Sequence, residues 1–174
     1  MLINKRKLFN GFTLIELLVV MAILGILATV ALTSFASAQA RSRDSKRKSD
    51  LKQIATALEL YYSDYATYPS PDSGKIIGCP SAGTPLTCDW GVTGSRSEFT
   101  DGKTTYMKIV PKDPSGYNYY YRTVTVGSDR QGFQLFAHLE NTQDQALITP
   151  AYSCTGQANS CNFAITSPNV TATD

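Results

Sequence analysis

One apolar segment near the amino terminus constrains the fold of this chain more than any other feature. Residues 12–32 read FTLIELLVVMAILGILATVAL, a run with a single charged side chain, Glu16. A helix that rises 1.5 Å per residue covers about 31 Å over this length, which matches the hydrocarbon core of a bilayer. Because the first proline is Pro69, no proline interrupts a helix here. We therefore expect residues 12–33 to form the membrane-spanning and assembly half of a long helix.

Two ordinary interpretations of this segment leave features unexplained. A secretory signal peptide has an apolar core of about 7–15 residues followed by a small-residue cleavage site. Residues 36–40, ASAQA, offer such sites, but the apolar run is longer than that and Glu16 interrupts it. A simple single-span anchor explains the length but not Glu16, because a carboxylate within a membrane helix is costly and usually functional. This carboxylate therefore needs a partner.

The residues around Glu16 form a specific pattern. A short leader with three bases at residues 5–7 is followed by Gly11, then by Phe-Thr-Leu-Ile-Glu and the apolar run. This pattern resembles the processing signal of type IV pilins and of the pseudopilins of type II secretion. The resemblance implies that a prepilin peptidase removes the leader, residues 1–11, by cutting between Gly11 and Phe12 on the cytoplasmic side. It also implies that the new amino terminus at Phe12 is N-methylated.

Glu16 has a physical role in this scheme. Cleavage creates a cationic amine at Phe12, and opposite charges attract strongly in an apolar medium because screening there is weak. In a filament, the amine of an incoming subunit can pair with Glu16 of its neighbour, so that neither charge is left buried without a partner. We therefore expect Glu16 to recruit subunits and to set their register.

A basic segment, here called the collar, occupies residues 41–52. The chain has a net charge of +2, but residues 53–174 carry more acids than bases. The positive-inside rule would place the collar in the cytoplasm, whereas the more specific pilin resemblance places it outside. The collar can then serve assembly by meeting the acidic heads of neighbouring subunits. Binding of nucleic acid is the weaker alternative, because no aromatic residues alternate with these bases. The collar bases are Arg41, Arg43, Lys46, Arg47, Lys48 and Lys52.

After the collar, apolar side chains recur at steps of three and four residues, which is typical of one amphipathic helix face. We expect the helix to continue to about residue 65 and to end before Pro69, with residues 34–66 as its amphipathic half. The apolar face would pack against a sheet. Its members are Leu51, Ile54, Ala55, Leu58, Tyr61, Tyr62 and Tyr65.

The sequence of residues 67–174 predicts a small globular part. Residues 67–105 are rich in Gly, Pro, Ser and Thr, which indicates a long loop that needs a tether. Residues 106–140 contain runs of aromatic and β-branched residues and are expected to form an antiparallel sheet packed on the helix. Residues 141–174 are expected to be a loop or tail. The fold class is therefore α+β, which the pilin resemblance also implies. The expected strands are 106–110, 117–126 and 133–139.

The turn after residue 110 carries a second resemblance. Residues 111–119 read PKDPSGYNY, similar to the Pro-x-Asp-Pro-Trp-Gly-x-x-Tyr stretch of major pseudopilins, with Ser115 in place of Trp. The calcium loop of that family would follow the later strands. Asn141 and Asp144 offer oxygen atoms there but form no known ligand pattern, so we expect no metal and no other cofactor.

The four cysteines lie in Gly- and Ser-rich loops, at Cys79, Cys88, Cys154 and Cys161. Four cysteines allow three pairings, and their spacing differs from that of structural zinc sites. We favour Cys79–Cys88 and Cys154–Cys161, each closing a small loop, with crossed pairing as the alternative. Either arrangement fits an oxidising compartment outside the cytoplasm.

These features predict a structural subunit and not an enzyme, because the chain lacks a phosphate-binding loop and a nucleophile elbow. The expected function is that of a pilus or pseudopilus subunit, inserted in the inner membrane with its globular part outside the cytoplasm, that polymerises through its amino-terminal helix. The expected partners are a prepilin peptidase, copies of itself and related pilins, the inner-membrane assembly platform and membrane lipid. The assembled filament would be periplasmic or extracellular. The alternative is a minor or competence subunit that binds DNA or a surface.

Overall fold

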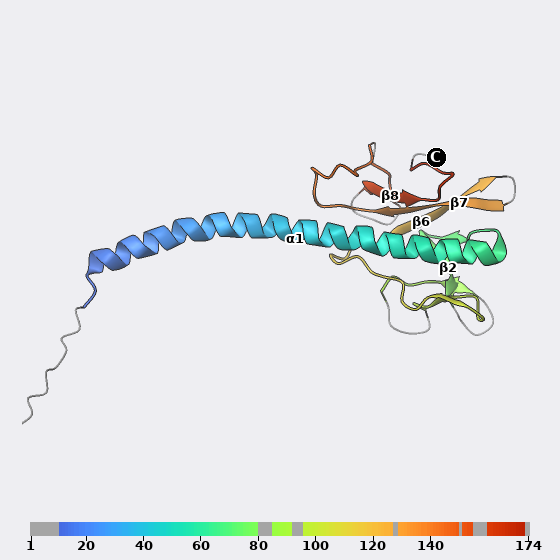
Figure 1. Ribbon diagram of the computed structural model, residues 1–174, viewed down its shortest axis with the longest axis horizontal. Coiled ribbons are helices and arrows are strands. Elements are labelled where there is room, and N and C mark those ends of the chain that lie inside the picture. Colours follow the sequence, from blue (N-terminus) through green and yellow to red (C-terminus); the bar gives the residue numbers. More distant parts are fainter. Residues whose placement is uncertain are drawn as a thin grey trace, which may run out of the picture. The chain divides into compact units, whose positions relative to one another are not determined.

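A computed structural model describes residues 11–79, 85–91, 96–126, 129–149, 151–154 and 160–172, without the side chains of residues 30–34 (Figure 1). The chain divides into two compact units, Met1–Gln39 and Ala40–Asp174, and the second is called the head below. Helix α1 (Leu14–Tyr65) contributes residues to both units.

Helix α1 ends where the sequence predicts. Its last residue is Tyr65, and Ala66 adopts a left-handed backbone with φ of 54°. A left-handed residue at this position is a common way to leave a helix, and the N–H of Ala66 donates to the carbonyl oxygen of Tyr62 at 2.7 Å. Pro69 follows shortly and cannot continue a helix. The expected boundary near residue 65 is therefore confirmed.

The strands of the head form small antiparallel sheets. They are β1 (Pro71–Asp72), β2 (Lys75–Cys79), β3 (Leu86–Thr87), β4 (Phe99–Thr100), β5 (Thr105–Met107), β6 (Tyr120–Val126), β7 (Asp129–Ala137) and β8 (Phe163–Thr166). Within the described residues, one sheet joins β1, β2 and β3, another joins β4 and β5, and a third has the order β6–β7–β8. The long helix and these sheets make the α+β fold that was expected.

Five of the described strands lie in segments that the sequence predicts to be loops. Strands β1, β2, β3 and β4 fall within residues 67–105, and β8 falls within residues 141–174. Strand β8 pairs with β7 from Gln134 opposite Thr166 to Ala137 opposite Phe163. It has 4 residues, too few for a periodic pattern to stand out, and its pairing depends on a distant strand. The structure therefore differs from the expectation at both places.

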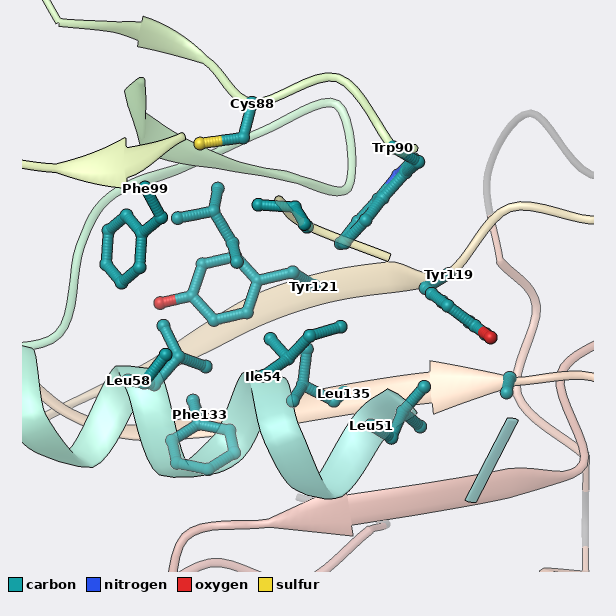
Figure 2. Packing of buried hydrophobic residues seen from close by; sticks show 14 of the residues in the cluster. Leu51, Ile54, Leu58, Cys88, Trp90, Phe99, Tyr119, Tyr121, Phe133 and Leu135 are labelled. Atoms are coloured by element: carbon teal, nitrogen blue, oxygen red, sulfur yellow. The ribbon is translucent and has the colours of Figure 1, made fainter. Parts of the chain in front are cut away.

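The main core of the head forms where α1 packs against the β6–β7–β8 sheet (Figure 2). Leu51, Ile54 and Leu58 of α1 are at most 1% exposed and belong to one cluster with Tyr121 of β6 and Phe133 of β7. The helix face predicted from periodicity is thus buried at Leu51, Ile54 and Leu58, whereas Tyr65 at its end is 45% exposed. The cluster also includes Cys88, Trp90, Phe99, Tyr119 and Leu135.

Strand β7 is covered on both faces, because all residues from Phe133 to Ala137 are buried. One face joins the main core. On the other face, Phe136 clusters with Cys154 and Cys161 of the tail. A strand covered on both sides has a continuous apolar run instead of an alternating one. The tail is therefore part of the folded head.

Candidate functional site

Helix α1 begins with reciprocal hydrogen bonds between Thr13 and Glu16. The backbone N–H of Thr13 donates to Oε2 of Glu16 at 2.9 Å, and the Thr13 hydroxyl donates to the same oxygen at 2.6 Å. In return, the backbone N–H of Glu16 donates to the Thr13 hydroxyl at 3.3 Å. This capping box satisfies groups that the first helical turn would leave unpaired. Thr13, to which no role was assigned from the sequence, therefore holds the Glu16 side chain.

Gly11 and Phe12 lie immediately before this cap, in non-helical backbone. The side chain of Phe12 is 83% exposed. The peptide bond expected to be cleaved therefore lies outside the helix. Residues 1–10 of the expected leader lie outside the described residues. Glu16 is exposed and makes no ion pair with any described residue.

The side chains of α1 from residue 14 to residue 29 are exposed throughout. Most are large and apolar, and Leu14 and Ile15 are 82% and 69% exposed. Over the part of the chain that the structure describes, no helix is both long enough and apolar enough to cross a membrane. A continuous exposed apolar surface of this kind marks an interaction site.

In the head, collar bases pair with loops that are distant in the sequence. Arg43 makes a two-pronged ion pair with Glu140, in which its Nε donates to Oε1 at 2.8 Å. Nζ of Lys48 lies 2.6 Å from Oδ2 of Asp144. Both acids follow β7, so these pairs hold the segment after β7 against the helix.

Arg47 is the centre of this group and is 0% exposed. Its Nε donates to Oδ2 of Asp113 at 2.6 Å. Its Nη1 donates to Oδ1 of Asp44 at 2.6 Å, and its Nη2 lies 2.8 Å from Oε1 of Glu140. The Ser115 hydroxyl accepts a further hydrogen bond from Nη2. One buried guanidinium therefore joins α1, the turn before β6 and the segment after β7.

The carboxylates around Arg47 are themselves held by other groups. Asp44 accepts the backbone N–H groups of Glu140 at 3.0 Å and of Asn141 at 2.8 Å. Asp113 accepts the N–H of Ser115 at 2.8 Å and its hydroxyl at 3.0 Å. Buried charges are tolerated when they are paired and fully hydrogen-bonded, and these contacts meet that condition. Ser115, which replaces the Trp of the pseudopilin pattern, accepts a hydrogen bond from Arg47 that an indole, which can only donate, could not accept.

These contacts correct the expectation that the collar as a whole faces neighbouring subunits. Arg43, Arg47 and Lys48 pair with acids of their own head, and Lys46 pairs with Asp50 on the same helix at 3.6 Å. Arg41 and Lys52 are exposed and make no ion pair with a described residue. A run of bases looks the same in a sequence whether its charges are solvated or paired, so the pattern alone could not separate the two groups.

The ion pairs lower the pKa of the acids after β7. The pKa of Glu140 falls from its usual 4.5 to about 2, chiefly because Arg43 donates a hydrogen bond to it, with a smaller contribution from Arg47. The hydrogen bond from Lys48 likewise lowers the pKa of Asp144. Both acids are therefore charged at neutral pH.

The two disulfides join Cys79 to Cys88 and Cys154 to Cys161, the pairing favoured from the sequence over the crossed one. The Cα–Cα separations are 5.0 Å and 5.8 Å, within the usual range for a disulfide. The first disulfide belongs to the main core and closes the segment between β2 and β3. The second packs on Phe136 and ties the tail to the outer face of β7.

The single histidine of the chain makes local packing and hydrogen-bond contacts. Nδ1 of His138 lies 2.8 Å from the carbonyl oxygen of Ser160, and its ring packs edge-on against Tyr117. Within the described ranges, no group of three His, Cys, Asp or Glu side chains is arranged to hold a metal ion.

Comparison with known proteins assigns the chain to a family. The family described as "Prokaryotic N-terminal methylation motif" matches residues 6–32. The type II secretion system core protein G of Pseudomonas aeruginosa is 35% identical over 119 residues, which are 67% of this chain and 75% of that protein. The chain belongs to the pilin and pseudopilin family.

Two further relatives show the breadth of the family. The type IV major pilin protein PilA of Myxococcus xanthus is 27% identical, and the match covers 89% of this chain and 86% of that protein. The type II secretion system core protein G of Vibrio cholerae is 30% identical over 68% of this chain and 73% of that protein. No solved structure shows a significant match. The chain is therefore a structural subunit of the pilus or pseudopilus type, as the FTLIE pattern predicted.

Replacement of Asp113 should destabilise the head. Asp113→Asn keeps the side-chain shape but removes one of the charges that balance the buried Arg47. Removing one partner of a buried ion pair typically costs about 3–5 kcal/mol, and we expect the lower end because Asp44 and Glu140 remain. Unfolding in guanidinium chloride measures the loss. Asp72→Asn is the matched control, because Asp72 is exposed and makes no ion pair with a described residue. Equal losses in both variants would contradict the role of Asp113.

The stability of the head should depend on Glu140 in acid. Its folded-state pKa of about 2 lies below the usual 4.5, so its contribution is complete above pH 4.5 and is lost as the pH falls towards 2. Urea unfolding between about pH 2 and pH 6 measures this dependence. Glu140→Gln, which removes the ionisable group, should flatten the profile. Identical profiles for wild type and Glu140→Gln would refute the assignment.

Proposed function

We propose that the chain is made as a precursor and that a prepilin peptidase removes residues 1–11 by cutting between Gly11 and Phe12. The amine exposed at Phe12 is then N-methylated. The observation that carries this proposal is the Gly-Phe-Thr-Leu-Ile-Glu segment within the matched methylation motif, followed at once by the Thr13–Glu16 cap of α1. The scissile bond precedes the helix, so cleavage leaves the cap and everything after it intact.

The mature chain is inserted in the inner membrane through residues 12–33, with its head outside the cytoplasm. Two considerations support this arrangement. The apolar side chains at the start of α1 are exposed in the isolated chain and need a lipid or protein partner. The two disulfides belong in an oxidising compartment. The subunit is structural and not catalytic, and the assembly platform of the inner membrane is its partner before polymerisation.

Polymerisation joins copies of this chain, and related pilins, through α1, and Glu16 guides it. Among the described residues, the Glu16 carboxylate receives hydrogen bonds only from the neutral groups of Thr13, so none of them compensates its charge. In an apolar surrounding, the cationic amine at Phe12 of a neighbouring copy would supply the missing charge. The resulting filament is periplasmic or extracellular.

A role as a DNA-binding minor or competence subunit has less support. Affinity for nucleic acid depends largely on the number of bases that reach phosphates. Four of the six collar bases, Arg43, Lys46, Arg47 and Lys48, are engaged by acids of their own head. A phosphate backbone would meet a correspondingly weaker positive surface.

Processing can be tested directly by co-expression of the full chain with a prepilin peptidase. We expect amino-terminal sequencing and intact mass to show a chain that starts at Phe12 and carries one added methyl group. Gly11→Arg should block cleavage, because a bulky charged side chain would then precede the scissile bond. A start between residues 36 and 41 would instead indicate a signal peptide and would defeat the proposal.

The role of Glu16 can be separated from processing by comparing two variants. Glu16→Gln keeps the side-chain size and a hydrogen-bonding oxygen for Thr13 but removes the charge. We expect normal cleavage and at least about a tenfold lower yield of sheared filaments, because the buried amine would lose its opposite charge. Thr13→Ala removes the hydroxyl bonds of the cap and keeps the charge, and it should reduce the yield less. Wild-type filament yield from Glu16→Gln would rule out the pairing.

A further inference from the structure

A polar hollow opens in the head between the start of its helix and the segment after β7. Its volume is about 520 Å³, within the range of about 300–1,000 Å³ that small-molecule sites occupy. Helix α1 contributes Arg41 and Lys48 to its lining, and the segment after β7 contributes Asn141, Gln143 and Asp144. All the described residues that line it are charged or polar. The hollow therefore suits a small ligand with polar or charged groups.

The charges that line this hollow are balanced except at Arg41. Nζ of Lys48 lies 2.6 Å from Oδ2 of Asp144. Asp44, which also lines the hollow, accepts a hydrogen bond from Nη1 of Arg47 at 2.6 Å. Arg41 is exposed and makes no ion pair with a described residue. The hollow therefore presents one unpaired guanidinium and one neutral ion pair.

The unpaired base and the ion pair follow each other along one face of α1. Arg41 and Lys48 are seven residues apart, which is about two helical turns and about 10 Å along the axis. Oδ1 of Asp144 also accepts the N–H of Ala146 at 2.9 Å. Because a carboxylate offers about four acceptor sites, Asp144 retains room for another donor. A ligand that spans the hollow thus meets a free cation first and a carboxylate second.

Side-chain amides complete the lining. The amide groups of Gln143 and Gln145 make no hydrogen bond with a described residue. Each amide carries an NH2 group that donates and an oxygen that accepts, so it can serve either an anionic or a cationic part of a ligand. A metal cation fits less well, because it would leave Arg41 unpaired and would repel it.

The hollow also lies close, along the chain, to the segment proposed to enter the membrane. Residue 33 ends that segment, and Arg41 follows it after eight residues of the same helix, about 12 Å of rise. The headgroup layer on each side of a bilayer core is about 5–8 Å deep. Helical side chains lean towards the amino-terminal end of their helix, and an arginine side chain is long. The guanidinium of Arg41 therefore comes within reach of lipid phosphates.

We propose that the hollow binds the phosphoethanolamine headgroup of a membrane lipid. The phosphate pairs with Arg41, since guanidinium and phosphate form strong charge-assisted hydrogen bonds. The terminal ammonium donates to Asp144 and to the amide oxygen of Gln143. In the lipid the phosphate is nearer the acyl chains than the amine, which is the order of Arg41 and Asp144 along the hollow. The inference rests on the proposed membrane insertion of residues 12–33 and names the lipid that holds the head at the bilayer surface.

The charge balance of the hollow favours this headgroup over two other common ones. A phosphatidylglycerol headgroup offers Asp144 only neutral hydroxyl groups. The quaternary ammonium of phosphatidylcholine has no N–H to donate to the carboxylate or to an amide oxygen. Specificity is a difference of affinities, and both competitors lose the contact at the far end of the hollow while keeping the phosphate contact. The site should therefore discriminate through the amine of the lipid.

Lipid retention by the full chain tests the site. The chain is inserted in nanodiscs with equal amounts of phosphatidylethanolamine, phosphatidylglycerol and phosphatidylcholine, and native mass spectrometry after release counts the lipid that stays bound. We expect phosphatidylethanolamine to exceed each of the others at least about fivefold, as a hydrogen bond between charged groups supplies. Arg41→Gln should remove this preference. Lys52→Gln should keep it and is the matched control, because Lys52 is also an exposed collar base without an ion pair to a described residue but does not line the hollow.

The ammonium end of the site is tested by Asp144→Asn. This variant removes the carboxylate and frees the Lys48 ammonium, so the hollow gains positive charge. We expect the preference to move from phosphatidylethanolamine to the anionic phosphatidylglycerol. An unchanged preference would show that the amine does not lie at Asp144 and would overturn the assignment of the headgroup. Circular dichroism of each variant reports on folding independently.

The outcomes separate this site from the proposed membrane insertion. If the wild-type chain enters no nanodisc, the insertion and the lipid site both fail. If it enters but retains the three lipids equally, or if Arg41→Gln retains phosphatidylethanolamine as wild type does, the lipid site is wrong and the membrane-inserted subunit stands. The lipid site is also wrong if soluble glycerophosphoethanolamine displaces the lipid at equal concentration, because the occupant is then a solute.

Discussion

The head depends on one buried positive charge, the guanidinium of Arg47. A charge removed from water is tolerated only when carboxylates within hydrogen-bond distance balance it. These carboxylates come from three places in the chain: Asp44 on α1, Asp113 in the turn before β6 and Glu140 after β7. The requirement to pair Arg47 therefore holds the turn before β6 and the segment after β7 against helix α1. The apolar core of Figure 2 begins at Leu51, about one helical turn further along.

The same pairing changes the surface that the head presents. Judged from its sequence, the collar is a uniformly basic segment that could attract acidic partners, lipid phosphates or nucleic acid. Once folded, Arg43, Lys46, Arg47 and Lys48 are paired within the chain, and only Arg41 and Lys52 of the collar make no ion pair with a described residue. The positive surface that is left is sparse and would attract negative charge only weakly.

The helix could be predicted from the sequence because its signals are local. The spacing of Leu51, Ile54 and Leu58 and the stop at Pro69 depend only on near neighbours. The cap was also within reach, since Thr-x-x-Glu before an apolar run is a known signature. The pairing of Arg47 with Asp113 could not be predicted, because the two residues lie 66 positions apart. The sequence of the turn that carries Asp113 indicated only the backbone conformation of that turn. Strand β8 escaped prediction for a similar reason: it is short, and its pairing depends on β7 and on the second disulfide.

Arg47 and Glu16 show two answers to the same physical demand. Each is a charge on α1 in or near apolar surroundings, and each needs an opposite charge because hydrogen bonds from neutral groups do not cancel a net charge. Arg47 finds its carboxylates within its own chain, and the result is a folded head. Among the described residues, Glu16 has only the neutral donors of Thr13, so its charge is not balanced in the isolated subunit. Only another molecule can balance it, and the charge that cleavage would create at Phe12 of a neighbouring copy is of the required sign. A satisfied charge thus explains the stability of the subunit, and an unsatisfied one explains why it would assemble.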